Sequence, residues 1–152
     1  MAVEKMTLEK AQEILGQGFH CSQCVLWHTA EALGMDKDLA LKMSGGLGGG
    51  SFAGGTCGAV NGGVISLGLV YGFNEPNAAE QNAILVEKVN ELERRFTEKN
   101  GTIMCKELLA GWDFSRPGHM EKIMNEGLTV NCPQFCVDVC DILDDMLADY
   151  LK

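Results

Sequence analysis

Basic side chains are scarce in this chain, which has 12 Lys and Arg against 21 Asp and Glu and a net charge of -9. Proteins that bind nucleic acid without regard to its sequence neutralise phosphates with Lys and Arg, and surfaces that dock on anionic lipid do the same. The charge balance therefore argues against both classes, and we expect no nucleic-acid partner.

A long apolar run is also missing. The most apolar stretch, residues 58–73, is too short to span a bilayer and contains Asn61 and several glycines. The first ten residues are charged and lack the apolar core of a signal peptide. We therefore expect no membrane insertion and a cytoplasmic location. Cysteines stay reduced there, so a cysteine-rich pattern points to metal binding or catalysis rather than to a disulfide framework.

Strand patterns are absent as well, because no segment alternates β-branched residues with polar ones. Apolar residues recur at helical spacing in nearly every segment, with no internal repeat or linker between them. A chain of 152 residues is long enough to bury a real core. We predict a single compact all-α domain over residues 1–152, with Thr56 capping a buried, glycine-rich central helix at 57–72.

Two further helices matter for the later argument. Ser22 is the predicted cap of a helix that ends at Gly34. The longest helix is predicted over residues 76–99, and one face of it carries an apolar stripe. Such a stripe usually packs against a core, and less often pairs two subunits. A homodimer through this helix is the alternative reading. The stripe consists of Leu85, Val89, Leu92 and Phe96.

Seven cysteines are present, an odd number that cannot all pair within one chain. Four of them stand where a helix is predicted to begin: Cys21, Cys57, Cys105 and Cys132. The unpaired N–H groups and the dipole at a helix start favour negative charge, so a thiol there loses its proton more readily. Brought together by folding, these four would form a metal or cluster site, or a group of reactive thiols.

The other three cysteines carry weaker signals. Cys24 completes a CxxC with Cys21, but no strand precedes the pair, which weakens a thioredoxin-like interpretation, and no His follows Cys24, which excludes c-type haem attachment. Cys136 and Cys140 continue a row that starts at Cys132 with a spacing of four residues, and such a row lies on one helix face. We interpret Cys24 as a core residue and treat Cys136 and Cys140 as secondary.

A glycine-rich segment over residues 44–56 leads directly into Cys57. It matches a dinucleotide-binding fingerprint loosely, but no strand precedes it and no Gly-Lys-Ser/Thr follows. We expect an ordered loop in which Leu47 and Phe52 are buried. Its glycines would allow backbone N–H groups to approach sulfur or sulfide closely.

Catalytic patterns are otherwise lacking, so whether the protein is an enzyme stays open and no catalytic residue is assigned. The chain has three histidines, His20, His28 and His119, and no Ser-His-Asp order or catalytic carboxylate pair. Near the C-terminus an acidic run is most simply a solvated helix face. It consists of Asp138, Asp141, Asp144, Asp145 and Asp149.

Taken together, five segments resemble the C-GCAxxG-C-C family of redox-active proteins. They are Cys21-Ser22-Gln23, the glycine run 45–50, Cys57-Gly58-Ala59 with Gly62, residues 105–109, and Cys132-Pro133. The resemblance covers residues 11–147 and implies a small helical domain with a redox role. It maps the family's four cysteines onto Cys21, Cys57, Cys105 and Cys132. The chain is also similar to the non-haem portion of split-Soret cytochromes, which implies an iron–sulfur site but, without haem-attachment motifs here, no haem.

Three hypotheses about the site follow. The first is an iron–sulfur cluster, [2Fe–2S] in preference to [4Fe–4S], ligated by Cys21, Cys57, Cys105 and Cys132 and serving electron transfer to an unknown redox partner protein or redox sensing. The second is a metal-free thiol oxidoreductase or redox switch, with Cys57 as the low-pKa thiol and Cys21 or Cys24 as its resolving partner. The third is a structural zinc module.

Overall fold

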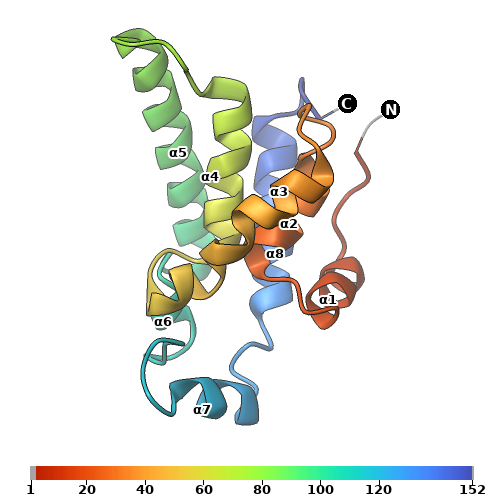
Figure 1. Ribbon diagram of the computed structural model, residues 1–152, viewed down its shortest axis with the longest axis vertical. Helices are drawn as coiled ribbons and strands as arrows, with labels where there is room; N and C mark the ends of the chain where they lie inside the picture. Colours follow the sequence, from red (N-terminus) through yellow and green to blue (C-terminus); the bar gives the residue numbers. More distant parts are fainter. Residues whose placement is uncertain (1–2, 152) are drawn as a thin grey trace.

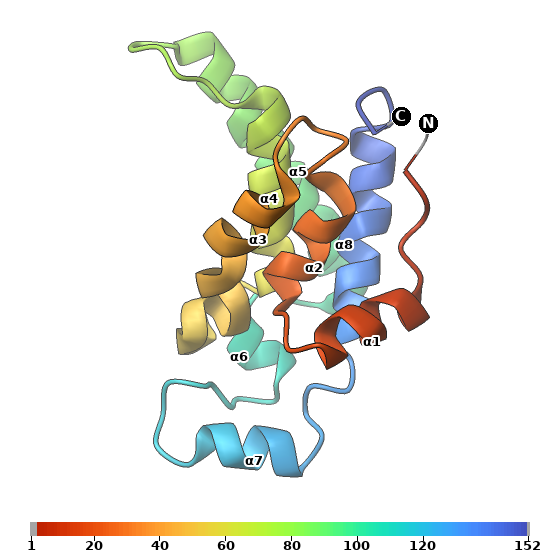
Figure 2. The same cartoon turned by 45° about the vertical axis from the view of Figure 1, so that its right-hand side comes forward.

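In the computed structural model, residues 3–151 are described; residues 1–2 and 152, the ends of the predicted domain, lie outside this part. Within 3–151 there are eight α-helices and no strand, which confirms the all-α prediction (Figures 1 and 2). The helices are α1 (Leu8–Gly16), α2 (Cys21–Thr29), α3 (Lys37–Ser44), α4 (Gly58–Tyr71), α5 (Ala79–Asn100), α6 (Cys105–Leu108), α7 (His119–Asn125) and α8 (Cys132–Met146).

Helix α4 lies at the centre of the molecule and packs against α2, α5 and α8. In Figure 1, α5 lies on one side of it and α2 and α8 lie on the other. Two glycines make this close packing possible. A Cβ atom on Gly62 would lie 2.8 Å from the carbonyl oxygen of Ser22, and one on Gly63 would lie 2.7 Å from Cδ2 of Leu92. The predicted glycine-rich central helix is therefore confirmed. Gly68 takes no part in the contact, since a Cβ there would meet nothing within 4 Å.

The main core is built from α1, α2, α4, α5 and α8. On α5, Leu92 and Phe96 are fully buried inside the chain, while Leu85 and Val89 are half-buried. The stripe on the long helix therefore packs within the chain over its C-terminal half. A homodimer through this helix stays a prediction. Among residues 3–151, no helix is both long enough and apolar enough to cross a membrane.

Several predicted caps are wrong. Ser22 lies inside α2, where its hydroxyl donates to the carbonyl oxygen of Ser44 at 2.7 Å, and α2 ends at Thr29 instead of Gly34. Thr56 does not cap α4, because its backbone pairs with Met104 in an isolated antiparallel bridge. In both cases a contact with a distant segment replaced the local capping role.

The acidic face of α8 is only partly solvated, which corrects a second expectation. Asp138 is 1% exposed and its carboxylate accepts hydrogen bonds from Lys99 at 2.8 Å and Gln134 at 2.8 Å. Asp144 accepts a 2.7 Å bond from Nε2 of the buried His28. Burying a carboxylate is costly unless it is paired, and these partners supply the pairing.

Helices α6 and α7 lie at one end of the molecule, and α7 stands apart from the helical body in both views (Figures 1 and 2). A small separate core joins this end to the rest. It consists of Cys105, Leu109 and Ile123, with Trp112 and Phe114 packed against it. Ile123 of α7 is fully buried there. His119, the first residue of α7, adds a second attachment, because its Nδ1 accepts from the N–H of Asp113 at 3.2 Å and its ring lies 4.5 Å from that of Trp112.

Candidate thiol site

All four predicted helix-start cysteines stand at helix starts. Cys21, Cys105 and Cys132 are the first residues of α2, α6 and α8, and Cys57 is the residue immediately before α4. The four helices come from different parts of the chain. Their starts face one another at the end of the molecule where α6 and α7 lie.

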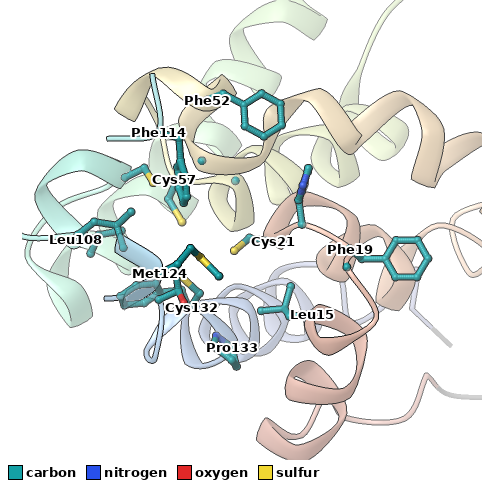
Figure 3. A pocket seen from close by; sticks show the side chains of 18 of the residues that line it. Leu15, Phe19, Cys21, Phe52, Cys57, Leu108, Phe114, Met124, Cys132 and Pro133 are labelled. Atoms are coloured by element: carbon teal, nitrogen blue, oxygen red, sulfur yellow. The ribbon is translucent and has the colours of Figure 1, made fainter. Parts of the chain in front are cut away.

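The four thiols line one cavity of about 500 Å³. The sulfur atoms of Cys21, Cys57 and Cys132 point toward its centre (Figure 3). Cys57 is 4% exposed and Cys105 8%, while Cys21 and Cys132 are half-buried. Folding therefore brings the four together, as a cluster or metal site built from these four cysteines requires. Across residues 3–151, no three His, Cys, Asp or Glu side chains converge closely enough to hold a single metal ion as they lie.

Cys57 and Cys105 are held side by side by their own backbones. The N–H of Cys57 donates to the carbonyl oxygen of Ile103 at 2.6 Å, and the N–H of Cys105 donates to that of Gly55 at 2.7 Å. These two bonds flank the Thr56–Met104 bridge. The bridge fixes the spacing of two thiols that are 48 positions apart in the sequence.

Cys21 is positioned by its neighbours at the start of α2. The N–H of His20 donates to Oε1 of Gln23 at 2.8 Å, which ties the residue before the helix to its first turn. Nδ1 of His20 is 2.8 Å from the carbonyl oxygen of Gly45, and Nε2 of Gln23 donates to that of Leu41 at 2.9 Å. The start of α2 is thus fastened to the end of α3 and to the glycine-rich segment.

The glycine-rich segment forms a wall of the cavity. It folds as two short irregular turns, Gly45–Leu47 and Gly50–Gly54. A Cβ on Gly48 would lie 2.6 Å from Cβ of His20. One on Gly49, whose φ is +59°, would lie 2.6 Å from Cδ2 of Phe114. The glycines therefore serve close side-chain packing around the thiols.

The backbone N–H groups of Ala59 and Val60, in the first turn of α4, partly offset the burial that raises the pKa of Cys57. The approach of amides from the glycine-rich segment to sulfur or sulfide stays a prediction. One other expectation about this segment is wrong. Phe52 is 41% exposed, since it lies at the cavity rim with its ring edge-on to His20 at a centroid distance of 5.2 Å.

The thiols differ in acidity. Hydrogen bonds from the thiols of Cys132 and Cys136 hold the pKa of Cys21 well below its ordinary value. The nearby His20 lowers this pKa further, while burial acts in the opposite direction. Burial raises the pKa of Cys57 to about 12 and that of Cys105 to about 11. The hydrogen bond that Cys132 makes to Cys21 raises the pKa of Cys132.

In the metal-free site, therefore, the thiol of Cys21 is the most acidic of the four. A helix start by itself did not lower every pKa, because burial outweighs the dipole at Cys57 and Cys105. This contradicts the assignment of Cys57 as the low-pKa thiol in the second hypothesis. The sulfur with the depressed pKa is that of Cys21.

The remaining cysteines lie behind the cavity. Cys24, Cys136 and Cys140 are fully buried, which confirms the core interpretation of Cys24. Cys136 nevertheless touches the site, because its Sγ lies 3.8 Å from the carbonyl oxygen of Cys21 and its thiol bonds to the Cys21 sulfur. In the sequence, only the four-residue spacing between Cys132 and Cys136 indicated that Cys136 lies on the same helix face as a site cysteine.

The sequence offered no sign of the apolar cavity wall. Its outer part comes from the loop before α7 and from α7 itself, through Phe114, Met120 and Met124. Neither segment carries a motif, and their position over the thiols is set by the small core at Ile123.

Comparison with known proteins agrees with the geometry. No curated protein and no solved structure matches the chain. A family model described as "Putative redox-active protein (C_GCAxxG_C_C)" matches residues 19–146, a span that contains all four cavity cysteines. Because this match covers most of the sequence, the chain belongs to the C_GCAxxG_C_C family of redox-active proteins.

Proposed function

We propose that this protein binds an iron–sulfur cluster, of the [2Fe–2S] type, through Cys21, Cys57, Cys105 and Cys132, and uses it for electron transfer or redox sensing. The observation that carries the proposal is the convergence of four thiols from four helix starts on one cavity. Membership of a family described as redox-active also supports the proposal, because an iron–sulfur cluster carries out redox chemistry.

The residues fit the proposed group in kind and in charge. Four cysteine thiolates are the usual ligand set of such clusters. Four thiolates, two sulfides and two ferric ions sum to a net charge of about -2. The positive ends of α2, α4 and α8 point at this charge, and the N–H groups of Ala59 and Val60 donate to the Cys57 sulfur.

A bound cluster would supply one-electron redox chemistry. The chain's own residues would set its access and its potential. The Thr56–Met104 bridge holds Cys57 and Cys105, and His20 fastens Cys21 to the glycine-rich segment. Apolar side chains line the cavity around the thiols, and a less polar surrounding strengthens each N–H to sulfur interaction.

The test is anaerobic purification followed by a visible spectrum and by iron, sulfide and zinc analysis of the same sample. Brown protein with two iron and two sulfide per chain is the expected result. Zinc at one per chain in colourless protein would replace the cluster with a structural zinc site. Colourless protein without metal would overturn both.

A thiol–disulfide function is the second candidate, and one observation favours it. The thiols of Cys21 and Cys132 line the same cavity, and hydrogen bonding from Cys132 and Cys136 holds the pKa of Cys21 well below its ordinary value, which favours Cys21 as an attacking thiol. It predicts that metal-free protein forms a reversible disulfide at Cys21, detected by peptide mapping. Absence of any disulfide at Cys21 after treatment with glutathione disulfide would contradict it.

A further inference from the structure

The cavity extends well beyond the four thiols. A volume of about 500 Å³ lies within the range of pockets that hold organic ligands. The two irons and two sulfides of the proposed cluster occupy only part of such a space. The thiols lie in the middle, and larger side chains surround them (Figure 3).

Charge is missing from the whole lining. In a chain with 33 charged side chains, none of the Asp, Glu, Lys or Arg residues lines this cavity. Phosphates and carboxylates are bound in proteins by Arg, Lys or a metal, and the proposed cluster would add negative charge. The lining therefore disfavours nucleotides and organic acids and favours an uncharged ligand.

Aromatic and methionine side chains form the walls. Phe114 and Phe135 belong to the lining, and Phe52 stands at the rim. Phe19 also lines the cavity, but its ring is turned away from the thiols (Figure 3). Met120 and Met124, one helical turn apart on α7, close the outer side. Flat rings stack on aromatic walls, and methionine adapts to the shape of what it covers.

Two polar side chains complete the lining, His20 and Thr129. Nδ1 of His20 is held by the carbonyl oxygen of Gly45, so Nε2 is the ring nitrogen that can meet a ligand. The Thr129 hydroxyl can donate or accept. A few polar groups in an apolar pocket serve to orient a ligand that carries one or two carbonyl or hydroxyl oxygens.

We propose that the apolar part of this cavity binds a small, uncharged molecule with a planar conjugated ring, of the quinone class, held within reach of the thiols. Only the redox use of this ligand rests on the proposed function; its binding is a property of the cavity alone.

Equilibrium dialysis of the full-length anaerobic protein with duroquinone tests the proposal. Duroquinone carries a methyl group at every free ring position, so protein thiols have no open ring carbon to add to. Its unchanged absorbance after dialysis verifies that it was bound and not consumed. We expect one saturable site per chain, and no binding of the charged quinone anthraquinone-2,6-disulfonate under the same conditions.

Variants connect the binding to the cavity. Phe114→Ala removes a ring wall and is expected to weaken duroquinone binding about tenfold. Met124→Ala, at a side chain that is 60% exposed and so expected to leave folding intact, is expected to weaken it roughly threefold. Met43→Ala is the matched control, because Met43 is 61% exposed but does not line the cavity.

Three results would overturn the proposal: no saturable duroquinone site, equal binding of the disulfonate, or an equal effect of Met43→Ala and Met124→Ala. The iron and sulfide analysis reports separately on the proposed function. Brown protein that binds no duroquinone rejects only the quinone site. Metal-free protein that binds duroquinone supports the quinone site and rejects only the cluster.

Discussion

The thiol of Cys136 donates to the carbonyl oxygen of Cys21 at 3.8 Å and helps to hold the pKa of the Cys21 thiol below its ordinary value. This contact joins a buried row on α8 to the thiol with the lowest pKa in the cavity. Cys136 belongs to no CxxC pair and is not one of the four positions implied by the family resemblance. Its relation to Cys21 exists only because α2 packs against α8.

The Cys136 contact predicts the reactivity of Cys21 in metal-free protein. Replacing Cys136 with Ala removes a donor to the Cys21 thiolate, so the pKa of Cys21 rises and its alkylation by iodoacetamide at neutral pH becomes slower. Mass-spectrometric peptide mapping over time measures the rate at Cys21. Cys140→Ala is the control, since Cys140 is equally buried on the same helix and does not affect the pKa of Cys21. Equal rates in both variants would contradict the role of Cys136.

Loss of one proposed ligand should remove the cluster. Cys105→Ser is expected to lower the iron and sulfide content severalfold and to change the visible spectrum, because a thiolate would be missing from the set of four. Cys140→Ser is the control, because it also removes one of the seven thiols but Cys140 does not line the cavity. Its iron and sulfide content should match that of the parent protein. A Cys105→Ser protein with full cluster content and an unchanged spectrum would reject the ligand assignment.

Alkaline pH should destabilise the metal-free protein. Burial raises the pKa of Cys57 to about 12 from an ordinary value of 9.0. Between these values the unfolded chain has released the Cys57 proton while the folded chain retains it, so the free energy of unfolding falls as pH rises. Urea unfolding at pH 8, 9 and 10 under reducing conditions measures the slope. Cys57→Ser should flatten it, and an unchanged slope would show that Cys57 does not contribute.

Replacing glycine with alanine on α4 should destabilise the protein at Gly62 and stabilise it at Gly68. Gly62→Ala places a Cβ 2.8 Å from the carbonyl oxygen of Ser22, so α2 must move, and we expect a loss of about 1–3 kcal/mol in the free energy of unfolding. Gly68→Ala meets nothing within 4 Å and gains helix propensity, which predicts a stabilisation of up to about 1 kcal/mol. Urea unfolding of both variants checks the signs, and a stable Gly62→Ala protein would contradict the packing.

Much of the fold was predictable because it depends on local patterns. Helical spacing, glycines and prolines are read within a few residues, and they located the starts of α2, α4, α5, α6 and α8 to within about three positions. The four cysteines at helix starts were recognised in the same way. The caps failed where a distant partner competed: Ser22 bonds to Ser44, and Thr56 pairs with Met104.

The sequence by itself determined that the chain is helical, that its central helix is rich in glycine, and that four cysteines stand where helices begin. Only the tertiary structure decided that these cysteines share one cavity, that Cys21 alone has a depressed pKa, and that uncharged side chains surround the thiols. The physical reason is that burial and hydrogen bonding between sulfurs depend on which segments meet. Segments far apart in the sequence meet through packing, and no local pattern encodes their distance.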